Sequence, residues 1–186
     1  MDTLLAVDEL MAALREFRAL AGSVDQTGEV LLGALRAGKK ILACGNGGSA
    51  AAATHLAEEL MGRYKGDRRS LGAVSLAADA ALMTCIANDF GFEYVFSRQV
   101  EGLGAAGDVV VLFSTSGNSA NLVRAVEAAR AAGCVSVALL GKGGGRMGGM
   151  ADYEVVVGSD STARIQEVHT LILHCWLERI EGGFRS

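Results

Sequence analysis

The amino-acid sequence predicts an α/β three-layer sandwich, in which helices flank a five-stranded parallel sheet on both faces. Five short apolar runs alternate with helical stretches over most of the chain, and no linker interrupts this alternation. Each run is almost continuously apolar, as expected for a strand that is buried on both faces of a parallel sheet. We expect strands at residues 39–44, 73–77, 108–113, 134–140 and 153–157, and helices at 48–64, 79–87, 92–103, 119–132 and 162–181.

Two further helices are predicted before the first strand, at residues 2–21 and 24–37. Their apolar side chains recur at near-helical spacing, as at Leu4, Leu5, Leu10, Leu14, Phe17 and Leu20. With 186 residues and 51% hydrophobic side chains, the chain is long enough to bury one sizeable core. We therefore expect a single domain over residues 1–186, whose N-terminal helices at 1–37 pack on that domain or on a neighbouring subunit.

Charge and hydropathy argue against several functional classes. The net charge is −4 and no dense run of lysine or arginine exists, which argues against nucleic acid as a main partner. No apolar run approaches membrane-spanning length, and the N-terminus carries Asp2, Asp8 and Glu9 where a signal peptide would be basic. We expect a soluble, cytoplasmic protein with no membrane partner.

Cysteine spacing favours a cytoplasmic protein, and the composition limits which residues make the turns. The cysteines lie far apart without CxxC spacing, and several sit in apolar runs, so reduced thiols are expected at Cys44, Cys85, Cys134 and Cys175. The chain has no proline and 25 glycines, so its turns must be made by glycine, asparagine, aspartate and serine.

A glycine-rich turn, GNGGSA at residues 45–50, lies between the first strand and a helix for which Ser49 is a plausible N-cap. Within that helix His55, Glu59 and Arg63 are spaced four residues apart, so they should share one face. Such a stripe is typical of a solvated helix face with a Glu–Arg pair. It also fits one wall of a catalytic site, if a ligand binds at the glycine-rich turn.

A second turn repeats this pattern further along the chain. The apolar run Val109 to Phe113 leads into a Ser/Gly-rich turn over Ser114 to Ser119, and a helix follows. Unpaired N–H groups and the helix dipole at such a position both favour a phosphate group. Both turns lie at the carboxyl ends of predicted parallel strands, where ligands of such sheets bind. Together they predict a phosphorylated ligand, with hydroxyl donors at Ser114, Thr115, Ser116 and Ser119.

The last predicted helix supplies further candidates. Gln166 and His174 are eight residues apart, which is two turns plus about 80° of rotation, so both can project into the same space. His169 lies roughly 140° from His174, and the two are not expected to serve one site. Because its neighbours are apolar, His174 can also be interpreted as a core imidazole satisfied by one hydrogen bond.

These residues resemble a known family. The chain is similar to the sugar isomerase (SIS) domain group, and within it closely resembles the bacterial phosphoheptose isomerases. The likeness covers nearly the whole chain, on the segments GNGGSA, HLAEELMGRY, ANDFGFEYVFSRQVE, GDVVVLFSTSGNSANLVRAVEAAR and RIQEVHTLILH. It implies the SIS fold and an aldose–ketose isomerase, which converts D-sedoheptulose 7-phosphate to D-glycero-D-manno-heptopyranose 7-phosphate in bacterial heptose precursor biosynthesis. The family also implies a homotetramer with sites at subunit interfaces.

The resemblance implies a role for individual residues. Glu59 matches the catalytic base and His174 its acid/base partner, while Arg63 matches a residue that lines the site. One Zn²⁺ per subunit is implied, with the ligand set His55, Glu59, Gln166 and His174. The implied substrate-binding residues are Asn46, Gly47, Gly48, Glu59, Arg63, Asn88, Asp89, Ser114, Thr115, Ser116, Ser119 and Gln166.

The residue types agree with this chemistry, since moving a carbonyl through an enediol needs a base and an acid. Zinc accepts His, carboxylate and amide ligands, although direct binding would lower the basicity of Glu59. The chain departs from the family at Ala163, where some members carry Asp and others Pro, so a role for Asp there does not carry over.

Three alternatives remain. A related SIS group binds the replication initiator DnaA without isomerase activity, and its positions matching Glu59 and His174 no longer carry a carboxylate and an imidazole. A sugar-phosphate sensor would need the two turns but no proton-transfer pair. A dinucleotide-binding protein is disfavoured, because GNGGSA lacks the full G-x-G-x-x-G spacing.

Overall fold

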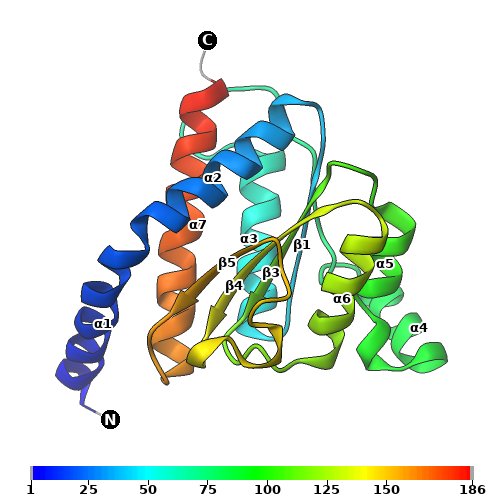
Figure 1. Ribbon diagram of the computed structural model, residues 1–186. Helices are drawn as coiled ribbons and strands as arrows, with labels where there is room; N and C mark the ends of the chain where they lie inside the picture. The colour runs from blue at the N-terminus through cyan, green and yellow to red at the C-terminus, as the bar shows by residue number, and fades with distance from the viewer. Residues whose placement is uncertain (1, 185–186) are drawn as a thin grey trace.

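A computed structural model describes residues 2–184 of the chain. It contains a parallel five-stranded sheet in the order β2-β1-β3-β4-β5, which confirms the predicted fold class (Figure 1). The neighbouring strands pair in register from Ile41–Ala73 at one edge to Val137–Tyr153 at the other. The strands are β1 (Ile41–Gly45), β2 (Ala73–Ser75), β3 (Val109–Ser114), β4 (Val135–Gly141) and β5 (Tyr153–Val157).

Side chains of the central strands alternate between two cores, which makes the sandwich three layers thick. In β1, Ile41 and Ala43 join one apolar cluster, whereas Leu42 and Cys44 join the other. The side-chain period of a strand is two residues, so a fully buried strand must be apolar at every position. All five residues of β1 are buried, which explains why the strands lack polar alternation.

Helices cover the two faces of the sheet (Figure 1). One face carries α2 (Ala21–Arg36), α3 (Gly48–Met61) and α7 (Thr162–Phe184), with α1 (Thr3–Phe17) at the side of α7. The other face carries α4 (Ala80–Phe90), α5 (Ser97–Leu103) and α6 (Ala120–Ala131). No helix between residues 2 and 184 combines the length and the apolar character that crossing a membrane requires.

Several predicted boundaries were wrong. The two N-terminal helices are joined without a break by a short 3-10 turn at Arg18–Leu20, since Gly22 weakens a helix but does not end it. The helix predicted at 92–103 is divided into a 3-10 turn at Phe92–Tyr94 and α5. A further 3-10 segment, Lys142–Met147, follows β4 and was not predicted.

The strand order creates a crevice between β1 and β3. From β1 the chain continues through α3 to β2 on one side, and from β3 it continues through α6 to β4 on the other side. The loops after these two strands therefore diverge at the carboxyl edge of the sheet. Open α/β sheets bind ligands at such a switch point, and both predicted ligand-binding turns lie there.

Candidate active site

A small pocket lies at the carboxyl ends of β1 and β3. The volume of this pocket is about 50 Å³. A cavity of about 10–15 Å³ can hold one water molecule, so the pocket is large enough for one small anionic group. Both predicted turns contribute to it. The lining residues are Asn46, Ser49, Phe113, Ser114, Thr115, Ser116, Ser119 and Leu122.

Hydroxyl groups shape the Ser/Gly-rich turn. Ser114 Oγ accepts a hydrogen bond from the amide of Gly117 at 3.0 Å, and Ser116 Oγ accepts one from the amide of Asn118 at 3.2 Å. Gly117 has a φ of 63°, and a Cβ there would lie 1.8 Å from the carbonyl oxygen of Gly144, so only glycine fits. Ser119 is the N-cap of α6, yet its side chain makes no capping hydrogen bond, which leaves its hydroxyl available to a ligand.

An amide pair joins the glycine-rich turn to the start of α6 across the crevice. Asn46 Nδ2 donates to Asn121 Oδ1 at 3.0 Å, and Asn121 Nδ2 donates to Asn46 Oδ1 at 2.8 Å. Asn121 was not among the predicted site residues. Because the two asparagines are 75 residues apart, no local pattern could have paired them.

A larger cavity of about 530 Å³ lies between α3 and α7. Gln166 packs against Gly48 so closely that a Cβ on Gly48 would lie 2.6 Å from its Nε2. Gly48 is therefore needed for the approach of the two helices, in addition to its place in the turn. The lining residues are Gly48, Ser49, Ala51, Ala52, His55, Ala163, Gln166, Glu167, His169 and Thr170.

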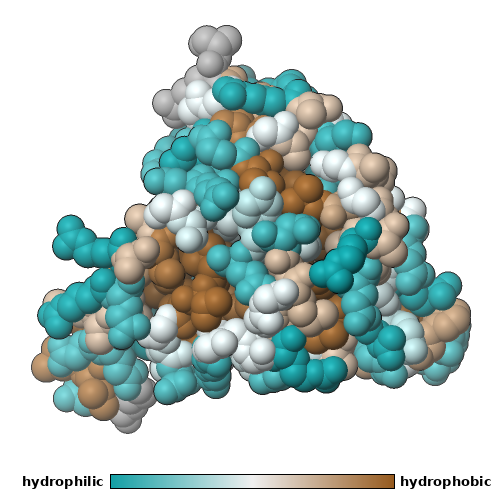
Figure 2. Space-filling model, viewed as in Figure 1, coloured by the Kyte–Doolittle hydropathy of each residue, from teal (hydrophilic) through white to brown (hydrophobic). Residues whose placement is uncertain are grey.

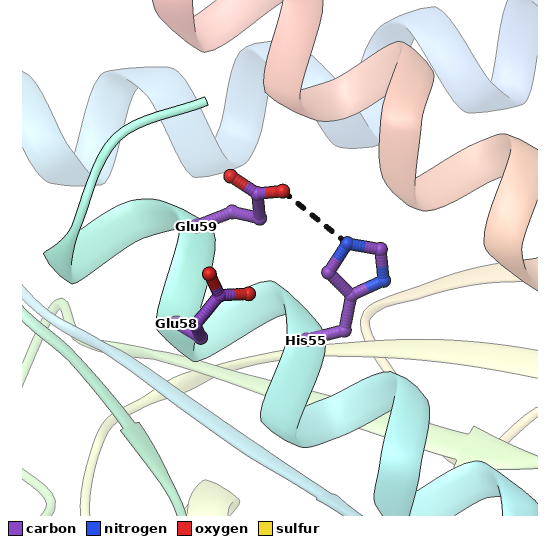
Figure 3. A group of neighbouring side chains, drawn as sticks. All are labelled: His55, Glu58 and Glu59. Carbon is purple, nitrogen blue, oxygen red and sulfur yellow. Dashed lines mark ion pairs between the residues drawn. The ribbon is translucent and has the colours of Figure 1, made fainter. Parts of the chain in front are cut away.

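His55 and Glu59 point toward one another from successive turns of α3, with Glu58 beside them (Figure 3). His55 Nε2 lies 3.4 Å from Glu59 Oε1, and the Glu59 side chain is 18% exposed. His174 approaches from α7, with its ring centroid 5.2 Å from that of His55. Tyr64 stacks on the His174 ring, with 6.0 Å between the ring centroids and an interplanar angle of 21°. Two helices thus bring a carboxylate and two imidazoles together.

A metal ion fits part of this group. Ligand atoms of His55, Glu58 and Glu59 all lie within 4.8 Å of one another. Two members of the implied ligand set are therefore adjacent, and His174 lies beside them. Gln166 lies two turns before His174, about 12 Å along the axis of α7, and packs against Gly48.

The buried imidazole of α7 is His169, whereas His174 is half-buried. The ring of His169 is 1% exposed, and its Nε2 lies 3.1 Å from the carbonyl oxygen of Leu140, at the end of β4. Burial lowers the pKa of His169 to about 4, and the hydrogen bond to Leu140 opposes this shift in part. His169 is therefore neutral near pH 7, and the core-imidazole interpretation applies to it and not to His174.

Other predicted residues lie elsewhere. The helix predicted at 48–64 ends at Met61, so Arg63 is exposed beyond its end and does not continue the polar stripe of His55 and Glu59. Asn88 and Asp89 are exposed on α4, across the sheet from α3 and α7 (Figure 1). Asn88 Nδ2 donates to Asp89 Oδ1 at 2.8 Å.

The predicted N-cap of α3 was also wrong, because the N-cap is Gly47, with a φ of 55°. Ser49 instead lies in the first turn, is 5% exposed, and lines both cavities. Sequence reasoning missed Ser49 as a site residue, although its place directly after two glycines was a usable signal.

Comparisons with known proteins agree with this geometry. Residues 7–141 match the SIS domain family. A phosphoheptose isomerase of Campylobacter jejuni is 48% identical over 170 residues, which cover 91% of each protein, and one of Akkermansia muciniphila is 46% identical over 177 residues, 94% of each. The solved phosphoheptose isomerase of Neisseria gonorrhoeae superposes with a TM-score of 0.91 at 43% identity, over 96% of each chain. That of Francisella tularensis has a TM-score of 0.91 at 34% identity, over 98% of this chain and 100% of that one.

Proposed function

The chain belongs to the phosphoheptose isomerase family of SIS-domain proteins, and from this premise we propose that it isomerises D-sedoheptulose 7-phosphate to D-glycero-D-manno-heptopyranose 7-phosphate. This step would supply an aldose phosphate for heptose precursors of cell-surface polysaccharide. The observation that carries the proposal is the meeting of Glu59 and His55 on α3 with His174 on α7. The chain is also 43% identical to a solved phosphoheptose isomerase over 96% of its length.

Glu59 and His174 divide the proton transfers of the reaction. Glu59 removes a proton from C1 of the ketose, the C1–C2 double bond of an enediol forms, and Glu59 returns the proton to C2. His174 moves protons between the oxygens on C1 and C2, so that the carbonyl passes from C2 to C1. Each such transfer is typically worth about 10²–10⁴ in rate.

The Ser/Gly-rich turn binds the phosphate end of the substrate. Ser119 offers a hydroxyl that no capping bond uses, at the N-terminus of α6, where the helix dipole favours an anion. Asn46, Gly47 and Gly48 form the facing turn of the crevice. The position of these groups at the β1–β3 switch point supports their role.

We assign a zinc ion to this cluster, one per subunit. Ligand atoms of His55 and Glu59 lie within 4.8 Å of one another and of Glu58, and the His174 ring is adjacent, 5.2 Å from that of His55. A bound zinc ion would polarise the carbonyl oxygen and stabilise the enediolate charge. Gln166 belongs to the implied set; it lines one cavity with His55, and its side-chain amide packs against Gly48.

Exposed apolar residues support a homotetramer. Figure 2 shows hydrophobic surface over α1 at the lower left, where Leu4 is 70% exposed, Leu5 51% and Met11 48%. Patches of this kind mark contacts between proteins. Sites at subunit interfaces would also explain why Asn88 and Asp89 lie across the sheet from Glu59 in one chain. A particle mass near four times 19.2 kDa in light scattering would support the tetramer, and a monomer would refute it.

We infer a cytoplasmic location, where thiols stay reduced. This agrees with four free cysteines within residues 2–184.

The test is direct turnover. Purified protein is incubated with sedoheptulose 7-phosphate, and the aldose product is followed by proton NMR. Formation of the heptose 7-phosphate is the expected result. A folded protein that forms no aldose but binds DnaA would overturn the proposal in favour of the non-enzymatic SIS regulator.

A further inference from the structure

A buried ion pair ties the loop after α3 to α7. Arg68 Nε lies 3.2 Å from Glu181 Oε2, and both side chains are 3% exposed. Glu181 Oε1 also accepts a hydrogen bond from the amide of Gly66. Because a charge left unpaired at such a depth is costly, this pair holds the loop in one position against α7.

Arg68 also caps the end of α3. Its Nη2 donates to the carbonyl oxygen of Glu59 at 2.7 Å, and its Nη1 donates to that of Leu60 at 2.9 Å. The last carbonyls of a helix have no partner within the helix, so the guanidinium group satisfies and fixes them. The helical turn that carries the proposed base is therefore held by Arg68.

The same loop reaches the proposed acid. Tyr64 belongs to it and stacks on the His174 ring, at 6.0 Å between centroids. One loop, residues 62–71, thus contacts the backbone of Glu59 through Arg68 and the ring of His174 through Tyr64. These contacts join α3 and α7 at the level of the acid/base pair.

We propose that Arg68, acting with Glu181, is a positioning residue that sets the placement of Glu59 relative to His174. The inference rests on the proposed isomerase function. Arg68 acts through the backbone of Glu59 and through the loop that carries Tyr64. Only an arginine provides several donors in one planar fork, which can pair a carboxylate and cap two carbonyls at once.

Kinetics test the inference first. Arg68→Met keeps the length of the side chain but removes all of its donors. A displacement of a catalytic group by about 1 Å lowers the rate by about 10²-fold. If Glu59 shifts in this way, kcat of Arg68→Met should fall by about that factor, while its KM stays within about twofold of the wild-type value. Arg68→Lys keeps the charge but not the fork, and it should recover part of the lost kcat. A purely structural role would lower the melting temperature without this separation of kcat from KM.

Arg179→Met is the matched control. Like Glu181, Arg179 lies on α7. It pairs with two carboxylates, Asp25 and Glu29, and both belong to α2. Its loss removes both of these ion pairs of α7 without removing a contact to α3 or to the loop at residues 62–71. We expect its kcat to equal that of the wild type.

A second variant guards against misfolding. Arg68→Met combined with Glu181→Leu removes both charges of this ion pair together, and such apolar replacements of buried pairs often keep stability. The folded double variant should still show the kcat loss, because the carbonyl of Glu59 loses its Arg68 donor, whereas that of Leu60 keeps the amide of Leu71. Wild-type kcat in this folded variant would overturn the inference.

An activity-independent measurement separates the inference from the proposed function. The ring nitrogen NMR shifts of His174 should change in Arg68→Met and stay constant in Arg179→Met. Unchanged shifts in Arg68→Met would overturn the positioning role. A wild-type protein without isomerase activity would instead overturn the proposed function. The nitrogen shifts of His174 would then be the only test of whether Arg68 is a positioning residue.

Discussion

Glu59 is the side chain on which the proposed chemistry depends most directly. Glu59→Gln preserves shape and helix propensity but removes the base, so kcat should fall by at least about 10²–10⁴ while binding changes little. Steady-state kinetics and calorimetric titration measure the two effects separately. His174→Ala should cause similar damage, and the combined variant should be far from additive if the pair acts as one unit. Near-normal turnover by Glu59→Gln would contradict the proposed role of Glu59 as the base.

The serine hydroxyls of the phosphate-binding turn make a second prediction for single residues. Ser116→Ala or Ser119→Ala should weaken substrate binding by about 1–3 kcal/mol, the range for a lost hydrogen bond to a charged group. Thr84→Ala is a suitable control, because its hydroxyl donates only to carbonyls of its own helix. Calorimetry with the sugar phosphate measures the difference. Equal affinities in all three variants would show that the phosphate binds elsewhere.

Individual side-chain pairings could be predicted only where they are local. The i, i+4 spacing of His55 and Glu59 predicted their shared face, and they lie 3.4 Å apart. The Arg68–Glu181 pair was not predicted, because 113 residues separate its members and no period connects them. Long-range partners depend on which helices pack together, which the sequence pattern of each helix does not encode.

Among the secondary-structure elements, α7 is joined to the sheet by a hydrogen bond of His169. Its Nε2 lies 3.1 Å from the carbonyl oxygen of Leu140 in β4, and burial lowers its pKa to about 4. The folded state therefore binds fewer protons than the unfolded state between about pH 6.5 and pH 4. Stability must fall as the pH falls through this window, by up to about 3 kcal/mol.

Urea unfolding of wild type and His169→Gln across this window measures that contribution. Glutamine can still donate to Leu140 but does not titrate. The stability advantage of the wild type should shrink as the pH falls from 6.5 to 4. A difference that stays constant with pH would contradict the buried, neutral state of His169.

The metal prediction concerns two elements, because the proposed zinc ligands come from both α3 and α7. A chelator should lower activity and leave a folded protein, since structural zinc sites usually hold thiolates and this set has none. Added zinc should restore activity, and His55→Ala should reproduce the chelated state. Circular dichroism monitors the fold and elemental analysis monitors the metal. Full activity in a demonstrably metal-free preparation would contradict the metal prediction and show that Glu59 and His174 act without a metal ion.

Elements themselves were predicted well, and their ends were not. Strands such as β5, Tyr153–Val157, agree with prediction because continuous apolar runs mark strands buried on both faces. The end of α3 at Met61 was missed because donors from the following loop satisfy its last carbonyls. One is Ser70 Oγ, which donates to the carbonyl oxygen of Met61 at 2.8 Å, and helix periodicity does not register such a cap.

For the whole molecule, the strand order explains where the chemistry lies. The order β2-β1-β3-β4-β5 opens a crevice between β1 and β3, and α3 and α6 begin on its two sides with N-termini toward the ligand. The acid/base pair lies further along α3 and α7, so a sugar phosphate can lie with its phosphate at the crevice and its carbonyl toward Glu59. Apolar residues left exposed on α1 are the surface that the proposed homotetramer would use for contacts between chains.

Isomerisation in deuterium oxide reports on the proposed proton transfer by Glu59. If Glu59 carries the proton from C1 to C2 through an enediol, the carboxylic acid can exchange with solvent before it returns the proton. We expect deuterium at C2 of the heptose 7-phosphate by NMR, and no detectable conversion by Glu59→Gln over the same period. Conversion by the wild type that leaves C2 free of deuterium, matched by equal conversion in Glu59→Gln, would contradict this proton transfer.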